Sequence, residues 1–189
     1  MTLPLAYRLL HESATQQLSV WRAPDLAQER LRKGYLAHLA AHPEAMWKWG
    51  PSAHFTASCI VLDATGTRAL LTLHKKAGTW LQFGGHFEPG DADAYAAGQR
   101  EAREESGIKS LVAFPQMIQL DRHHLVGSFG RCREHLDLRF VAVADDDAKH
   151  VVSEESLDVR WWPTDALPDR TRQELGPLVA VARSALGLT

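Results

Sequence analysis

The chain has 189 residues, of which 45% are hydrophobic and 23% are charged, and its formal net charge is −2. This composition is typical of a globular protein with one sizeable core, and the near-neutral charge gives no overall basic field that would attract nucleic acid. No run reaches the roughly 18 apolar residues of a membrane span, and the first residues lack the pattern of a signal peptide. We therefore expect a cytoplasmic protein without nucleic-acid or membrane partners.

The first 50 residues predict helices. A short helix is expected within residues 3–18, and a stronger one from Pro24-Asp25 to about residue 41, where leucines recur near helical spacing. His42-Pro43 ends the second helix, because a proline disfavours helical geometry in the residue before it. Residues 1–50 are thus interpreted as a helical extension packed on a main domain that spans residues 51–189.

Met46, Trp47 and Trp49 form an aromatic-rich cluster at the end of this extension. We interpret the cluster as a hydrophobic anchor that docks the helices on the main domain. A stacking platform for a base and a contact between two copies of the chain are the alternatives.

After residue 54 the pattern changes to short apolar runs separated by turn residues. Asp63 to Gly66 has the composition of a hairpin turn, and Lys75 to Gly78 that of a second turn. One or two helices are expected over residues 164–186. Strands are expected at residues 55–62, 69–74, 80–83, 136–144 and 159–162, with one or two more between residues 108 and 120. Strands that flank a crossover helix, with helices at both ends, predict an α/β fold with α/β/α layers.

The most informative stretch is GGHFEPGDADAYAAGQREAREESGI, residues 84–108. A Pro-Gly turn precedes Asp91 and Asp93, either of which can cap the N-terminus of a helix. Residues 94–106 lack proline, and Gly107 suits the left-handed position that follows a helix. Gly98 costs about 1 kcal/mol relative to alanine inside a helix, which favours close packing of this helix on a sheet as its reason.

Three carboxylates, those of Glu101, Glu104 and Glu105, fall within one arc of about 100° on the predicted helix. Their mutual repulsion is relieved by a hard cation with oxygen ligands, for which Mg²⁺ fits best and Mn²⁺ is tolerated. The alternative is a solvated acidic face whose surface ion pairs contribute little stability. That alternative explains neither the glycine pair before the helix nor the glycine after it.

Residues 100–108, REAREESGI, resemble the second half of the Nudix box, R-E-U-x-E-E-x-G-U, in which U is aliphatic. Gly85, followed after five residues by an acid, resembles its first half. Two departures are present: the acid is Asp91 rather than glutamate, and eight rather than seven residues separate it from Arg100. In the family this acid usually braces the arginine, and either Asp91 or Asp93 is a candidate for that role here.

Membership of the Nudix family would imply an α/β/α sandwich with a mixed sheet. The implied activity is Mg²⁺-dependent cleavage of a diphosphate linkage in a nucleoside diphosphate joined to a group X, or in a related organic pyrophosphate. Family members are often homodimers. The resemblance assigns metal ligation to four positions and an orienting role to Arg100, and it leaves open whether Glu104 or Glu105 is also the general base. The implied ligands are the Gly84 carbonyl, Glu101, Glu104 and Glu105.

Substrate contacts are predicted outside this stretch. His135, Asp137 and Arg139 share one face of their predicted strand, where Arg139 would form a fork for phosphate. An exposed sheet face or edge is the alternative. Lys75 could meet a diphosphate, although lysines in turns are commonly just solvated. Glu154 or Glu155 is a candidate base, because the family sometimes uses an acid outside the box.

Neither the two cysteines nor His123, His124 and His135 predict a further metal site. Cys59 and Cys132 do not form a C-x-x-C pair, so no zinc or redox motif is evident. His123 and His124, joined only by His135, are too few for zinc. Two other functions were weighed: a Nudix-like module that binds a metabolite without chemistry, and a diphosphate isomerase of the same fold, which would need a reactive cysteine.

Overall fold

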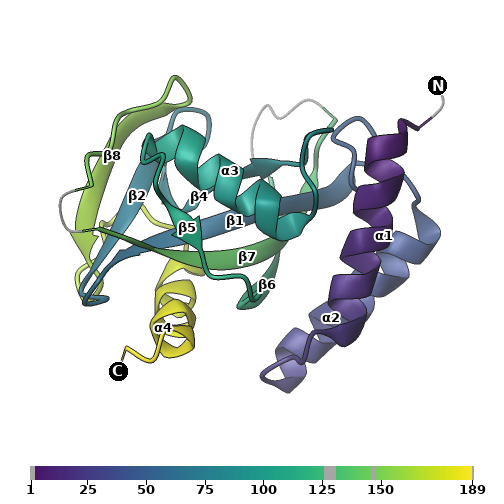
Figure 1. Ribbon diagram of the computed structural model, residues 1–189, viewed down its shortest axis with the longest axis horizontal. Coiled ribbons are helices and arrows are strands. Elements are labelled where there is room, and N and C mark those ends of the chain that lie inside the picture. The colour runs from purple at the N-terminus through teal and green to yellow at the C-terminus, as the bar shows by residue number, and fades with distance from the viewer. Residues whose placement is uncertain (1–2, 126–130, 146–147, 189) are drawn as a thin grey trace.

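The computed structural model describes residues 3–125, 131–145 and 148–188, and within these residues eight strands form one sheet (Figure 1). In chain order the elements are α1 (Leu5–Val20), α2 (Leu26–Ala41), β1 (Ala53–Asp63), β2 (Arg68–His74), β3 (Trp80–Leu81), β4 (Phe83–His86), α3 (Ala94–Ser106), β5 (Val112–Ala113), β6 (Gln119–His124), β7 (Glu134–Ala144), β8 (Ser156–Pro163) and α4 (Leu175–Ala185).

The centre of the sheet is a long parallel pair, β1 and β7. The pairing runs from Ala53 opposite Glu134 to Asp63 opposite Ala144. On its other side β1 pairs antiparallel with β4 through its first half and with β2 through its second half. Strands β5 and β6 flank β7, while β3 and β8 flank β2. The sheet is therefore mixed, which confirms the predicted fold.

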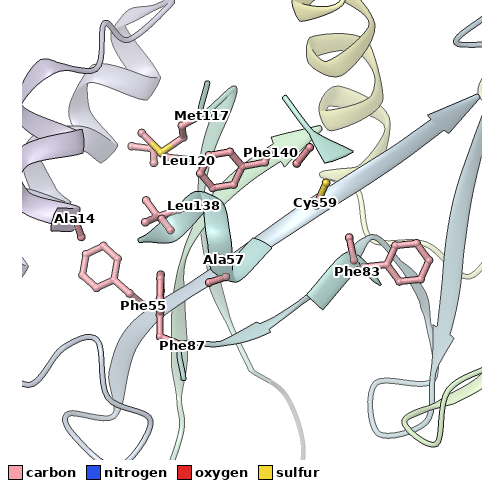
Figure 2. Packing of buried hydrophobic residues seen from close by; sticks show 14 of the residues in the cluster. Ala14, Phe55, Ala57, Cys59, Phe83, Phe87, Met117, Leu120, Leu138 and Phe140 are labelled. Atoms are coloured by element: carbon pink, nitrogen blue, oxygen red, sulfur yellow. The ribbon is translucent and has the colours of Figure 1, made fainter. Parts of the chain in front are cut away.

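The sheet is covered on both faces, as the α/β/α prediction requires. Phe55, Ala57 and Cys59 of β1 join the hydrophobic cluster that includes α3, together with Leu138 and Phe140 of β7 (Figure 2). The alternate residues further along β1 join a second cluster that includes α4. Because side chains alternate along a strand, one strand supplies both cores. α3 and α4 thus lie on opposite faces.

Gly98 lets α3 approach the sheet closely. A Cβ at this position would lie 3.1 Å from Cδ2 of Phe140 and 3.3 Å from the Ser58 carbonyl oxygen. This contact supplies the packing reason that the sequence suggested for a glycine inside the helix. The absence of a side chain at Gly98 therefore allows the short distance between α3 and the strands β1 and β7.

The N-terminal helices share the hydrophobic cluster of the α3 face. Asp25 caps α2 by accepting a hydrogen bond from the Gln28 amide at 2.8 Å. The indole of Trp21 donates to the Met117 carbonyl at 2.7 Å, which ties the end of α1 to the segment before β6. Met46 is buried and Trp47 packs against the same cluster, whereas Trp49 is exposed.

The chain between residues 164 and 186 contains one helix, α4, among the described residues rather than two. The segment between 108 and 120 holds β5 and the start of β6, with a bend near Pro115. The sequence also predicts a polar, flexible loop at residues 127–133 and an acidic turn at residues 145–147, and both lie partly outside the described residues. In the part of the chain that the structure describes, no helix is both long and apolar enough to cross a bilayer.

Candidate active site

The loop between β4 and α3 is held by its two aspartates in different ways. Asp93 is the N-cap of α3 and accepts from the Ala96 amide at 2.8 Å. Asp91 instead forms a two-pronged ion pair with Arg100, at 2.9 Å to Nε and 3.1 Å to Nη2. The structure thus gives the bracing role to Asp91. Gly107 ends α3 in the left-handed conformation, with φ of 73°.

Arg100 connects this loop to the glutamates of α3. Its Nη1 lies 3.0 Å from Oε1 of Glu101 and 3.1 Å from Oε2 of Glu104. Its Nη2 also donates to the His86 carbonyl at 3.0 Å. The guanidinium therefore fixes two carboxylates and one backbone oxygen at once, which is an orienting role.

Glu101 and Glu105 lie against the glycine pair of β4. Glu105 is buried and accepts from the Gly84 amide at 3.0 Å. A Cβ on Gly85 would lie only 2.5 Å from Oε1 of Glu101, so a carboxylate fills the space where a side chain would be. Gly85 thus allows a carboxylate to approach the backbone closely, whereas Gly84 allows β4 to lie close to Ser58 of β1.

Burial makes these two carboxylates unusually basic. Burial raises the pKa of Glu101 to about 7 and that of Glu105 to about 8, and the charges of Glu104 and Glu155 act in the same direction. Glu104 differs, because its side chain is 60% exposed. Among the described residues, two groups of potential metal ligands have ligand atoms that all lie within 4.8 Å of one another. The three glutamates form neither of these groups.

A polar pocket of about 110 Å³ lies beside these groups, on the face of the sheet that α4 covers. Gly84, Gly85 and Glu105 form one part of its wall. The predicted polar face of β7 forms another part, and Arg172 and Glu174 before α4 close it. The pocket therefore brings together the glycine pair, one box glutamate and the β7 face.

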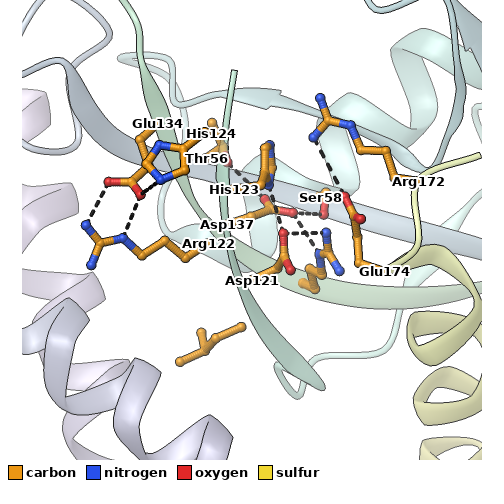
Figure 3. Close-up of polar contacts among 12 residues, drawn as sticks. Thr56, Ser58, Asp121, Arg122, His123, His124, Glu134, Asp137, Arg172 and Glu174 are labelled. Atoms are coloured by element: carbon orange, nitrogen blue, oxygen red, sulfur yellow. Dashed lines mark hydrogen bonds and ion pairs between the residues drawn. The ribbon is translucent and has the colours of Figure 1, made fainter. Parts of the chain in front are cut away.

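The floor of the pocket is a buried charge network (Figure 3). Arg139 is 1% exposed and pairs with Asp137 at 3.1 Å and Asp121 at 2.9 Å. Asp137 also accepts from the hydroxyls of Thr56 at 3.0 Å and Ser58 at 2.6 Å. The alternative of an exposed sheet face or edge is therefore wrong, because Asp137 and Arg139 are buried and β7 is paired on both sides.

The other candidate residues have different positions relative to the pocket. His135 lines the pocket, but Lys75 does not; its ammonium group donates to the Glu154 carbonyl in a turn. Cys59 is fully buried on the α3 face, where burial raises the pKa of its thiol, so it cannot serve an isomerase in the pocket. Glu155 is exposed, yet its charge reaches Glu101 and Glu105.

Several pocket residues were missed by the sequence reasoning. The signal for two of them was present, because His54, Thr56 and Ser58 alternate along β1 in the manner of a half-polar strand. The register places Thr56 opposite Asp137 and Ser58 opposite Arg139. Arg172 had no such signal, since tertiary folding alone brings it to the pocket. The same holds for Asp121, which pairs with Arg139 beside the pocket.

Buried carboxylates and guanidinium groups around one polar pocket define an enzyme site suited to phosphate chemistry. The chain belongs to the Nudix family, because the family model described as NUDIX domain matches residues 53–181. It is a Nudix-type hydrolase, a pyrophosphohydrolase in the general sense.

Solved structures support the same fold. An Ap4A hydrolase binary complex from C. elegans is 18% identical with a TM-score of 0.57, covering 70% of this chain and 97% of that one. The MutT protein from Methanosarcina mazei Go1 is 16% identical with a TM-score of 0.58, covering 71% and 96%. A NUDIX-family hydrolase from Clostridium perfringens is 24% identical with a TM-score of 0.51, covering 71% and 97%. Comparison with curated proteins finds no match.

Proposed function

We propose that the enzyme is a Mg²⁺-dependent pyrophosphohydrolase that cleaves the diphosphate linkage in a nucleoside diphosphate joined to a group X, or in a related organic pyrophosphate. One observation carries the proposal: Glu105 and the glycine pair line the same pocket as Arg139 and Arg172. A carboxylate that can bind a metal ion thus lies beside guanidinium groups that can bind a phosphate. Mn²⁺ would be able to replace Mg²⁺ at this site.

The residues present fit a divalent cation. Glu101 and Glu105 are largely buried carboxylates whose negative charges repel each other, and a cation would relieve that repulsion. We assign as its ligands the carboxylates of Glu101, Glu104 and Glu105 and the Gly84 carbonyl. Bound Mg²⁺ would supply neutralisation of the diphosphate charge and a lowered pKa for a water.

The side chains around the pocket have different proposed roles in the reaction. Arg100 holds Glu101 and Glu104 in place and does not line the pocket. Glu105 is our candidate for the general base that takes a proton from the attacking water, because it alone of the three glutamates lines the pocket. Glu104, with its exposed side chain, is assigned to metal binding only.

Phosphate recognition is assigned to the opposite wall. Arg172 pairs weakly with Glu174, at 3.7 Å, and retains donors for a phosphate. Arg139 and His135 line the same pocket and complete the proposed contact set, although Arg139 is already neutralised by two aspartates. Lys75 would contact only the part of a substrate that extends beyond the pocket.

The pocket holds only part of such a substrate. Its volume of about 110 Å³ is well below the roughly 300–1,000 Å³ of a typical ligand pocket. The diphosphate would lie inside, and the group X would lie over the open mouth. This arrangement is compatible with several substrates, including the dinucleoside polyphosphate named for the C. elegans structure.

The test is hydrolysis of a panel in the presence of Mg²⁺. The panel contains ADP-ribose, dinucleoside polyphosphates, nucleotide sugars, NADH, coenzyme A and nucleoside triphosphates. We expect cleavage of at least one member, and we expect Glu105→Gln to lower kcat by about 10²–10⁴-fold, the usual contribution of a general base. Glu88→Gln is the matched control, because Glu88 is an exposed glutamate of the same loop.

Metal binding is measured on the same variants to separate the two roles of the glutamates. Glu104→Gln should weaken Mg²⁺ binding, and excess Mg²⁺ should restore part of its activity. Glu105→Gln should remain slow when saturated with metal. Failure of the wild-type protein to cleave any panel member, together with Mg²⁺-independent binding of one, would instead support a binding module. The aspartate in place of the family's glutamate is no argument for such a module, because Asp91 pairs with Arg100 at 2.9 Å.

A further inference from the structure

Four potential metal ligands other than the box glutamates converge beside the pocket. They are His54 on β1, His86 on β4, His135 on β7 and Cys132 in the segment before β7. One ligand atom from each lies within 4.8 Å of every other. The register explains the meeting, because His54 is directly opposite His135 and β4 pairs with β1 so that His86 is opposite Thr56.

Two distances among these atoms are close to those between neighbouring ligands in a tetrahedral zinc site. The Nε2 atoms of His54 and His86 are 3.0 Å apart, and Sγ of Cys132 is 3.2 Å from Nε2 of His54. Zinc bonds of about 2.0–2.1 Å to nitrogen and about 2.3 Å to sulfur place neighbouring ligands about 3.3–3.6 Å apart. These two distances differ from the zinc values by only a few tenths of an ångström, and the ligand atom of His135 lies within 4.8 Å of the other three.

The hydrogen bond made by the His54 ring also favours metal binding by this cluster. Nδ1 of His54 lies 3.0 Å from the Pro51 carbonyl and must carry a hydrogen, so its Nε2 presents a lone pair to the cluster. Such a backbone contact is the usual way in which a protein orients a metal-binding histidine.

His135 provides an independent indication. Its Nε2 is buried and has no hydrogen-bond partner in the structure. An unpaired buried polar atom is destabilising and calls for an explanation. Its ring centroid lies 5.2 Å from that of His86 and 5.4 Å from that of His54, so a metal ion bound by the cluster would lie beside this ring.

The other group of potential ligands lacks these features. Asp121, His123 and Glu174 also have ligand atoms within 4.8 Å of one another. Asp121, however, already pairs with Arg139 at 2.9 Å and with His123 at 2.8 Å, and Glu174 lies near Arg172. Their charges are therefore balanced by protein groups.

We propose that His54, His86, Cys132 and His135 form a structural Zn²⁺ site. Imidazole and thiolate ligands select zinc over the oxygen-seeking Mg²⁺, so this site and the glutamate site would bind different metals. Four protein ligands close the zinc coordination shell and leave no position for a reacting water. His135 would give one ring nitrogen to zinc, and only its other ring nitrogen would be available to a substrate phosphate in the pocket. On binding, the thiol of Cys132 releases its proton to solvent.

The bound zinc would stabilise the backbone segments that surround the active site. It would join the segment before β7 to β1 and β4 at one end of the pocket. His86 follows Gly85, and its carbonyl accepts a hydrogen bond from Arg100. Fixing the His86 ring therefore also fixes the backbone on which the brace of the glutamates depends. The zinc site does not rest on the proposed reaction and can be tested without any substrate.

The test starts with wild-type protein stripped by a chelator and titrated with Zn²⁺, with bound metal measured by mass spectrometry. We expect one tightly bound zinc per chain and a higher Tm when it is bound. Cys132→Ser and His135→Asn should each weaken zinc affinity by more than about 100-fold, since loss of even an outer-shell partner weakens it about 10–100-fold. The matched control is His124→Gln, a change at an exposed histidine that should leave zinc binding intact.

Two further measurements identify the ligands. Zinc binding must survive in a Glu104→Gln, Glu105→Gln double variant, which removes the carboxylate site. Co²⁺ in place of zinc should give the charge-transfer absorption of a metal thiolate, and this result needs no variant that might misfold. The only other cysteine, Cys59, is fully buried on the opposite face. Absence of tight zinc binding, unchanged binding in both cluster variants, or its loss in the glutamate variant would overturn the proposal.

Discussion

The two faces of the β1–β7 pair are both buried but are built differently. On the face toward α3, the two strands present apolar side chains along almost their whole length. On the face toward α4, only the second half is apolar, with Ile60, Leu62 and Val141 beneath the helix. The first half of that face carries His54, Thr56 and Ser58 opposite His135, Asp137 and Arg139.

The difference shows how one strand pair supports both a core and a site. Apolar residues are stabilised by losing contact with water, without the need for a particular partner. Buried polar residues are stable only when each donor and acceptor is matched. The α3 face should therefore respond to changes in volume, and the pocket face to the loss of a single partner. The predictions below test this contrast, beginning with the largest expected effect.

Removal of Asp137 should cause the largest loss of stability. Asp137→Ala leaves the buried Arg139 with one carboxylate instead of two and removes the acceptor for Thr56 and Ser58. Breaking a buried ion pair typically costs about 3–5 kcal/mol. Urea denaturation measures the change, with Asp158→Ala, at a more exposed ion pair, as control. A loss below about 1 kcal/mol would show that the pocket face does not depend on matched partners.

Gly85→Ala should damage catalysis more than folding. The new Cβ would lie 2.5 Å from Oε1 of Glu101 and push the carboxylate from its position. Misplacement of a catalytic group by about 1 Å can lower the rate by about 100-fold, which corresponds to about 2.7 kcal/mol of activation free energy. Gly90→Ala is the matched control, since its Cβ would meet nothing within 4 Å. Equal kcat values for the two variants would contradict the prediction.

Gly98→Val tests the α3 face by adding volume. Even a Cβ here would be 3.1 Å from Phe140, so the larger side chain should force the helix away from the sheet. Overpacking of this kind typically costs about 1–3 kcal/mol. A second change, Phe140→Leu, should restore part of the free energy of unfolding by making room. If the double variant is as unstable as the sum of the single ones, the contact does not limit the approach of α3.

The smallest expected effect separates the two aspartates before α3. Asp93→Ala removes the helix cap and should cost about 1 kcal/mol of stability while activity changes little. Asp91→Ala should instead reduce activity, because Arg100 loses its two-pronged partner and holds Glu101 and Glu104 less firmly. Thermal unfolding and kcat are compared for both variants. A loss of activity in Asp93→Ala but not in Asp91→Ala would instead assign the bracing role to Asp93.

Much of the fold was predictable because local signals agreed. The helix over residues 94–106 was predicted with its observed bounds, since a capping aspartate and a terminal glycine mark its ends. Strand ends were less accurate: the last strand was expected at residues 159–162 and runs from Ser156 to Pro163. Its extra residues lie opposite β2, and this pairing is not visible in the local pattern.

The site was predictable only where its residues are close in sequence. The glutamates and Arg100 follow from one motif within one helix. Which aspartate braces Arg100 did not follow, because both lie at suitable distances in the sequence and only the loop conformation separates them. The convergence of His54, His86, Cys132 and His135 was also not predicted. These residues come from separate segments, and their meeting depends on strand register.

The parallel pairing of β1 with β7 also affects the order of folding. Ala53 and Glu134, paired at the start of the two strands, are 81 positions apart in the chain. Closing a loop of this length has an entropic cost that must be met before the paired strands stabilise it, and such long-range contacts form slowly. Helix α3 lies inside that loop and can form from local contacts alone. During synthesis the glutamates can therefore adopt their helix early, whereas the pocket beside them forms only after β7 has left the ribosome.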